Sequence, residues 1–119
     1  MTSTIRQFPT GANRSSEEGK LDYEGFLSPA ALKCFAEYMH RCRHLPDGTM
    51  RESDNWQKGI PQSVYMKSMW RHFMEVWRLN REPPPTSWGP DDAEALIENL
   101  CALLFNVQGM LHEVEKRRG

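Results

Sequence analysis

The sequence predicts an all-α protein: a small helical bundle of three main helices with a long functional loop and an irregular N-terminal arm, completed by oligomerisation. Two observations support this fold. Apolar residues recur at helical spacing in three stretches, near residues 28–43, 62–81 and 91–116, and no stretch carries a clear strand signal. At 119 residues the chain fits one domain. We therefore divide it into an arm, residues 1–25, and a single helical domain, residues 26–119.

The arm and the first helix differ in composition. Residues 1–25 mix Thr, Ser, Gly, Glu and Lys without periodicity, which is typical of an irregular segment. Ser28 and Pro29 then provide an N-cap followed by proline at the first helical position. Apolar side chains follow at helical spacing to about Arg43, and they are Leu32, Phe35, Ala36 and Met39.

A long loop precedes the second helix. Pro46-Asp47-Gly48-Thr49 is a strong turn signal, and the loop that it opens runs to Pro61. A loop of roughly 18 residues is long enough to suggest a function. Helical spacing returns over residues 62–81, and the apolar stripe comprises Tyr65, Met69, Phe73 and Val76, widened by Met66, Trp70 and Trp77. The helix is expected to stop before Pro83-Pro84-Pro85, because successive prolines lack amide donors.

The third helix has the clearest periodicity and predicts self-association. Its first turn contains Asp91 and Asp92, where negative charge suits the helix dipole. One broad apolar face comprises Leu96, Leu100, Leu103, Leu104, Val107, Leu111 and Val114. Cys101 and Phe105 point away from that face. A long helix that is apolar on more than one side needs more partners than two short helices supply, so we expect a homo-oligomer.

Composition and charge exclude several classes of partner. Fifteen basic and sixteen acidic residues leave a net charge of −1, so no global field attracts polymeric nucleic acid. The three cysteines are an odd number at no zinc-ligand spacing and are interpreted as reduced thiols. No stretch approaches the ~20 apolar residues of a membrane span, and no signal peptide is evident. We expect a soluble, cytoplasmic protein without a membrane partner.

The segment from Ser53 to Pro61, followed by the helix with Trp70-Arg71-His72, suggests a nucleotide site. The segment combines an amide, an indole and an ammonium in Asn55, Trp56 and Lys58. An indole can stack on a base, and ammonium and guanidinium groups can bind phosphates. Trp56 could instead fill the core, but its polar neighbours favour stacking.

The second helix offers further candidates, each with a structural alternative. Arg71 and His72 would clamp phosphate, with Glu75 as a metal ligand or an orienting group. The simpler interpretation is a hydrogen-bonded core histidine beside a surface ion pair of Arg71 with Glu75. At the end of the first helix, His40 and His44 lie at i and i+4 and could bind zinc, but this C-terminal location favours a simple interaction with the helix dipole.

Polar residues at the edge of the third helix form two lines. Asp92, Asn99 and Asn106 recur at spacings of seven, and a half-buried amide must find a partner in the backbone, in water or on a base edge. Glu94 and Glu98 lie farther round with Asp91. They would either bind a hard cation such as Mg²⁺ or form a solvated acidic face.

Several motifs, in order, resemble a bacteriophage family, the dATP/dGTP diphosphohydrolase domain. The resemblance runs from about Gly11 to Glu113, and its Asn-Trp-x-x-Gly and Arg-His elements are fairly specific. The motifs are Gly11-Ala12-Asn13-Arg14, Glu18-Gly19-Lys20-Leu21-Asp22, Phe26-Leu27-Ser28-Pro29, Ser53 to Pro61, Tyr65-Met66-Lys67-Ser68, Trp70-Arg71-His72 and Leu103-Leu104-Phe105-Asn106.

The resemblance implies an activity and a set of roles. The family is related to the all-α nucleoside triphosphate pyrophosphatases, helical oligomers that hydrolyse a dNTP to dNMP and pyrophosphate with Mg²⁺ held by helix carboxylates. It implies that Lys20, Lys58, Arg71 and His72 meet the phosphates and that Asn55 and Trp56 meet the base or sugar. The implied metal ligands are Glu75 with Asp92 or Glu94 and Glu98.

The acidic set departs from the family pattern and leaves two functions open. All-α pyrophosphatases usually carry Glu-x-x-Glu on one helix, whereas the second helix here offers Glu75 alone. The first hypothesis is a phage-encoded, Mg²⁺-dependent pyrophosphohydrolase of purine deoxynucleoside triphosphates in an infected bacterial host. The alternative is a non-catalytic sponge that sequesters a nucleotide or a cyclic-nucleotide immune signal. A third hypothesis is a purely structural helical oligomer, and the polar loop from Asn55 to Lys58 counts against it.

Overall fold

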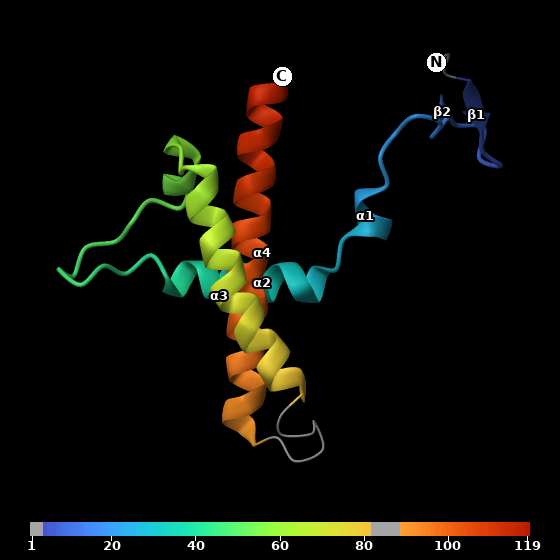
Figure 1. Ribbon diagram of the computed structural model, residues 1–119. Coiled ribbons are helices and arrows are strands. Elements are labelled where there is room, and N and C mark those ends of the chain that lie inside the picture. The colour runs from blue at the N-terminus through green and yellow to red at the C-terminus, as the bar shows by residue number, and fades with distance from the viewer. Residues whose placement is uncertain (1–3, 82–88) are drawn as a thin grey trace.

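The structure is a computed structural model that describes residues 4–81 and 89–119. In this part of the chain the elements are β1 (Ile5–Gln7), β2 (Asn13–Ser15), α1 (Tyr23–Phe26), α2 (Pro29–Arg41), the 3₁₀ helix η1 (Asn55–Lys58), α3 (Gln62–Arg81) and α4 (Pro90–Arg118). Figure 1 shows α3 and α4 side by side, with α2 running across them. The predicted mainly helical fold is confirmed. None of the described helices is long and apolar enough to cross a membrane.

The helix boundaries follow the predicted signals. The Ser28 side chain accepts a hydrogen bond from the amide of Ala31 at 3.1 Å and caps α2, with Pro29 at the first helical position. An Asp92 carboxylate oxygen accepts from the amide of Gly89 at 3.0 Å at the start of α4. The predicted stop at Pro83-Pro84-Pro85 lies outside the described residues.

The N-terminal arm contains regular structure that the sequence analysis missed. β1 and β2 pair antiparallel, with Arg6 opposite Arg14, and Gly11 turns between them at φ +89°. Arg6 also forms a 3.0 Å ion pair with Glu17. The expectation of no strand is therefore wrong, because backbone pairing across a tight turn needs no apolar alternation.

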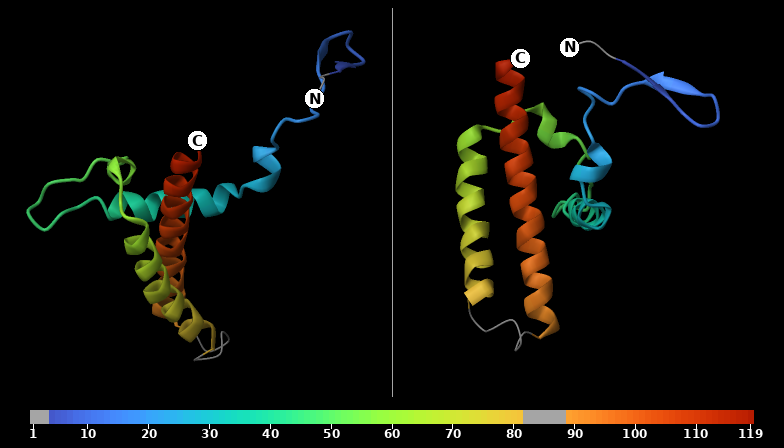
Figure 2. Two further views of the ribbon diagram at one scale, coloured as in Figure 1. Left: turned by 45° about the horizontal axis from the view of Figure 1, so that its top comes forward. Right: turned by 90° about the vertical axis from the view of Figure 1, so that its right-hand side faces the viewer.

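The long helices form three layers. In the right-hand view of Figure 2, α4 lies in the middle, with α3 on one side and α2, seen end-on, on the other. The radius of gyration is 19.9 Å, whereas a compact domain of this length has about 13.5 Å. The single chain is thus extended rather than closed around one core.

The contact between α3 and α4 uses small and polar residues of α4. The ring of Tyr65, 1% exposed, lies against Gly109, where a Cβ atom would overlap it. Ala102 and Asn106 are buried at the same helical spacing. The leucines of the predicted apolar face at positions 100, 104 and 111 are exposed instead. The predicted apolar face is thus correct only in part: Leu96 and Leu103 are half-buried, but α4 packs on α3 through a neighbouring side with Ala102, Asn106 and Gly109.

Candidate functional site

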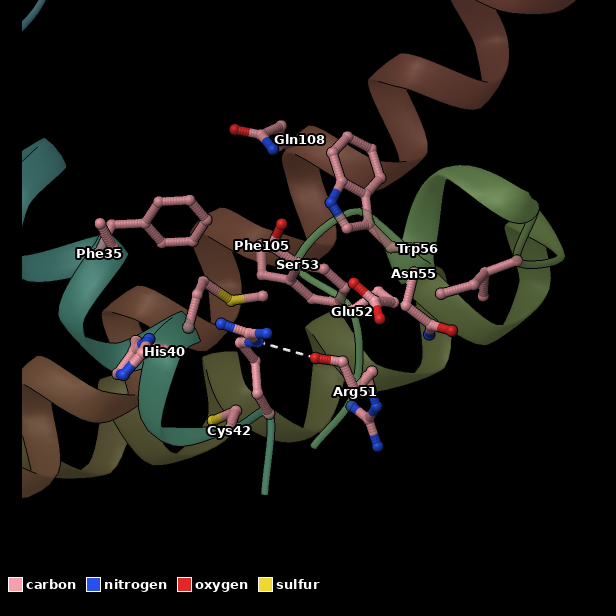
Figure 3. Close-up of a pocket in the computed structure, with 14 residues that line it drawn as sticks. Phe35, His40, Cys42, Arg51, Glu52, Ser53, Asn55, Trp56, Phe105 and Gln108 are labelled. Atoms are coloured by element: carbon pink, nitrogen blue, oxygen red, sulfur yellow. Dashed lines mark hydrogen bonds between the residues drawn. The ribbon is translucent and has the colours of Figure 1, made fainter. Parts of the chain in front are cut away.

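A pocket of about 430 Å³ lies where α2, the loop after it, η1 and α4 meet. Figure 3 shows Phe35 and His40 on α2, Asn55 and Trp56 at η1, and Phe105 on α4 around it. Its volume falls in the range of small-molecule sites, roughly 300–1,000 Å³.

Aromatic rings line one part of the pocket. Trp56 packs edge to face on Phe105, with ring centroids 6.4 Å apart, and Phe35 and Met39 add apolar surface from α2. Outside the pocket, Trp56 also packs against His112 at 4.8 Å between centroids. These contacts fix the indole ring, so Trp56 forms a rigid aromatic part of the pocket lining.

The residues next to Trp56 determine the backbone conformation that holds its side chain at the pocket. Asn55 and Trp56 begin the single 3₁₀ turn of η1, and the turn ends at Gly59, whose φ of +117° suits glycine. The amide of Gly59 donates to the carbonyl of Trp56 at 3.2 Å. The glycine of the Asn-Trp-x-x-Gly element is thus explained by the positive φ at which the 3₁₀ turn ends.

Polar and charged groups line the rest of the pocket. Arg43 Nε donates to the backbone carbonyl of Arg51 at 2.7 Å, and the Arg51 amide donates back to the carbonyl of Arg43 at 2.7 Å. Neither guanidinium forms an ion pair within the described residues. His40, Glu52, Ser53 and Gln108 complete the polar lining. Two guanidinium groups against one carboxylate give the pocket an excess of positive charge.

A turn at the outer end of the loop holds together the two chain segments that carry Arg43 and Arg51. His44 and Met50 form an isolated antiparallel bridge. Asp47 accepts from the hydroxyl of Thr49 at 2.6 Å and from its amide at 3.0 Å. The hydrogen bond from the hydroxyl is the main reason that the pKa of Asp47 is lowered. The predicted turn is therefore present, and it brings Arg43 and Arg51 together.

The predicted site residues do not all lie at the pocket. Asn55 and Trp56 line the pocket. Lys20, Lys58 and Arg71 are exposed and do not line it. His72 Nδ1 lies 2.9 Å from the side-chain oxygen of Asn99, between α3 and α4.

The two predicted amides of α4 find backbone partners. Asn99 donates to the carbonyl of Ala95 at 2.8 Å, and Asn106 donates to the carbonyl of Ala102 at 2.7 Å. The sequence left backbone, water and a base edge open as partners of these amides, and in the structure both amides bind the backbone. Asn106 is buried and belongs to the packed side of α4.

The carboxylates proposed for a metal do not gather in the single chain. Glu75 is bound by Arg78 at 2.9 Å, and this hydrogen bond is the main reason that its pKa is lowered. Asp92 caps α4, and Glu94 and Glu98 are exposed on that helix. Among the described residues no three His, Cys, Asp or Glu side chains form a group that could hold a metal ion.

Sequence reasoning missed most of the pocket lining. Arg43 and Arg51 stand in no motif, and Gln108 lies on no predicted polar line. One signal was present: Phe105 was expected to point away from the apolar face of α4, and it lines the pocket. His40, considered only for zinc, lies there too.

Comparison of the chain with protein-family models, with curated proteins and with solved structures gives no match. The resemblance to the phage diphosphohydrolase domain therefore stays a prediction.

Proposed function

We propose that the pocket binds a purine nucleotide or deoxynucleotide. The observation that carries the proposal is the placement of anchored aromatic rings beside two guanidinium groups that form no ion pair within the described residues. Aromatic side chains stack on bases, and each stacked base contributes about 1–3 kcal/mol. Guanidinium groups bind phosphate oxygens through paired hydrogen bonds. The two requirements of a nucleotide are met in one hollow.

The parts of the ligand are assigned by chemistry. Trp56 and Phe105 offer faces for the base, and Asn55 and Gln108 carry amides that recognise base edges. The terminal nitrogens of Arg43 and Arg51 are the phosphate donors, since only the Nε of Arg43 is used by the loop. This arrangement keeps the predicted roles of Asn55 and Trp56 and replaces Lys58 and Arg71 as the main phosphate contacts.

We further propose, from the resemblance, that the protein acts in phage nucleotide metabolism as a homo-oligomer in the cytoplasm of an infected bacterium. In that role it would hydrolyse dATP or dGTP to the monophosphate and pyrophosphate with Mg²⁺. Within the described residues of one chain the carboxylates named for Mg²⁺ do not form a metal centre, and Glu75 is engaged by Arg78.

The same observation favours a second function, binding without hydrolysis. A pocket with arginines and aromatic rings, and with Glu52 as its one carboxylate, suits retention of an intact nucleotide. A cyclic dinucleotide, with two bases and two phosphates, is the expected ligand class if the protein sequesters a host immune signal.

Calorimetric titration with dATP and dGTP tests the location of the site. Arg51→Ala should weaken binding by about 1.5–3 kcal/mol, as expected for a charge-assisted hydrogen bond. Lys58→Ala and Arg71→Ala are matched controls that remove a cation outside the pocket, and they should leave affinity unchanged. The opposite pattern would reject the pocket and restore the site predicted from the sequence.

Incubation with dATP or dGTP and Mg²⁺ separates the two functions. Release of pyrophosphate that Glu75→Gln abolishes supports the hydrolase. Recovery of intact nucleotide after hours of tight binding supports the sponge, and a cyclic dinucleotide that competes with dATP would define its ligand. Failure of all three ligands to bind would reject both functions.

A further inference from the structure

The exposed apolar residues of α4 follow a strict heptad pattern. They are spaced alternately by three and four residues and comprise Ile97, Leu100, Leu104, Val107, Leu111 and Val114. This is the a and d spacing of helices that pack lengthwise on other helices. A stripe of this regularity over five helical turns of surface indicates a partner helix, and within the described residues of the single chain none lies on it.

Four of the six exposed large apolar residues of α3 continue this surface. Met66, Trp70, Phe73 and Trp77 are spaced by four, three and four residues, and Trp70 is 62% exposed. The residues that pack between the two helices include Tyr65 and His72 on α3 and Asn99 and Asn106 on α4. On each helix, every residue of the exposed stripe follows a position of this packed side by one residue. One position is a rotation of about 100°.

The two exposed stripes lie on the same side of the helix pair. The chain runs in opposite directions along α3 and α4, as Figure 1 shows. Because the two helices are antiparallel, a step of one residue toward the C-terminus of each helix turns both exposed stripes toward the same side of the helix pair. We call these ten residues, on α3 and α4 together, the hairpin face.

We propose that the hairpin face is the docking surface for the same face of a second copy of this chain, giving a four-helix bundle. Each of the ten residues of the hairpin face is at least 38% exposed, so the packing that this surface offers is missing in the single chain. The charges point to a second copy as the occupant. α3 carries four basic residues and one acidic residue, whereas α4 carries six acidic and three basic residues.

These charges select one of the two ways to stack the faces. A two-fold axis parallel to the helices places the basic α3 of each copy on the acidic α4 of the other, and every neighbouring pair is then antiparallel. A perpendicular axis would place α3 on α3 and α4 on α4, with like charges together. The parallel axis is therefore the one that the surface fits.

The parallel axis also fixes the register, because it moves no residue along the bundle. Within one chain Tyr65 lies level with Gly109, and His72 lies level with Asn99. Trp70 is consequently level with the segment between positions 100 and 104. In the dimer Trp70 of one copy meets Leu104 of the other.

Light scattering at micromolar concentration tests the surface. The wild-type chain should have the mass of two chains, and Leu104→Glu should raise the dissociation constant by roughly 100-fold or more, because two charges per dimer would be buried in apolar surroundings. Leu32→Glu on α2 is the matched control, since Leu32 is 43% exposed and Leu104 is 40% exposed. Leu104→Ala, which buries no charge, should weaken the dimer by about tenfold and keeps the test valid if Leu104→Glu fails to fold.

A mixing experiment tests the arrangement. Trp70→Arg alone and Leu104→Glu alone should each be monomeric. Their mixture should form a heterodimer, in which one contact is an arginine with a glutamate and the other is native. Two monomers that stay apart on mixing would reject the parallel axis. A monomeric wild type, or an oligomer that neither substitution weakens, would reject the hairpin face.

The dimer and the nucleotide pocket stand on separate observations, although the dimer specifies the homo-oligomer named above. Neither Trp70 nor Leu104 lines the pocket. Loss of the dimer with unchanged dATP affinity would leave the proposed function intact, and a dimer that binds no nucleotide would reject the function alone.

Discussion

The two sides of α4 make contacts of different kinds. Toward α3 the helix packs along its length through Asn99, Ala102, Asn106 and Gly109, and the ring of Tyr65 fills the space at the glycine. Toward α2 it is crossed rather than followed, and Cys34 and Cys101 meet with their sulfurs 3.9 Å apart. Beyond that crossing the elements diverge and the pocket opens.

The difference shows how packing geometry separates stability from binding. Helices that run side by side keep their contacts over many turns, which leaves little room for a ligand. Helices that cross touch over a short length, and the diverging segments leave a hollow that loop residues can line. The α3 side of α4 should thus be sensitive to added volume, and the α2 side to changes in chemistry.

Gly109→Ala should give the largest loss of stability. A Cβ atom at this position overlaps the Tyr65 ring, so we expect a loss of about 3 kcal/mol, at the upper end of overpacking costs. Gly89→Ala is the matched control, because none of the described residues lies within 4 Å of its Cβ position. Chemical denaturation of both variants measures the difference. Equal stability of the two would show that the α3 contact has spare room.

Cys101 should resist alkylation on the α2 side. Burial, followed by the hydrogen bond with Cys34, raises the pKa of the Cys101 thiol from 9.0 to about 11. The reactive thiolate at pH 8 is then roughly 100-fold scarcer than for an unperturbed thiol. Iodoacetamide should modify the exposed Cys42 first, as mass spectrometry of the peptides would show. Equal rates for the two thiols would contradict the burial of Cys101.

The same raised pKa predicts a pH dependence of stability. The folded state favours the protonated thiol, so this contribution is complete below pH 9 and is lost as the pH rises through about 11. Cys101→Ala should flatten the stability curve in this window. Tyr38, whose pKa is raised to about 12 chiefly by burial, acts at still higher pH.

Asn99→Ala should have a smaller effect on the α3 side. It removes the contact with His72 at 2.9 Å, and we expect a loss of about 1.5 kcal/mol of stability. A double-mutant cycle with His72→Ala should show coupling between the two residues. Nucleotide affinity should not change. A selective loss of affinity would instead return both residues to the binding site predicted from the sequence.

Thr49→Ala should have the smallest effect on the pocket side. It removes the hydroxyl that donates to Asp47 at 2.6 Å, so the pKa of Asp47 should rise toward its ordinary value. An NMR titration of the Asp47 side chain measures this change. An unchanged pKa would mean that the turn does not hold this hydrogen bond in solution.

The local part of the fold could be predicted from the sequence. The predicted bounds of the second helix, residues 62–81, agree with α3, because helical periodicity is a property of neighbouring residues. The strands of the arm were missed because three-residue strands with polar side chains carry no periodic signal.

The candidate site could be predicted only in part, for a physical reason. Asn55 and Trp56 stand together in a polar loop, so their chemistry was visible. The turn after α2 brings Arg43 and Arg51 together, but only the crossing of α2 over α4 places them beside Gln108. Likewise, the heptad spacing of α4 showed an apolar face, but which side α3 would cover depends on Gly109 and its fit to Tyr65.

The central position of α4 has a consequence for biosynthesis. α2 and α3 each pack mainly on α4, and α4 follows both of them in the chain. While the ribosome is still translating the segment before α4, neither earlier helix has its packing partner, and isolated helices of 13 or 20 residues are marginally stable in water. Tertiary structure must therefore form late, after α4 has left the exit tunnel. Nascent chains stalled before residue 90 should be open to proteases along their whole length.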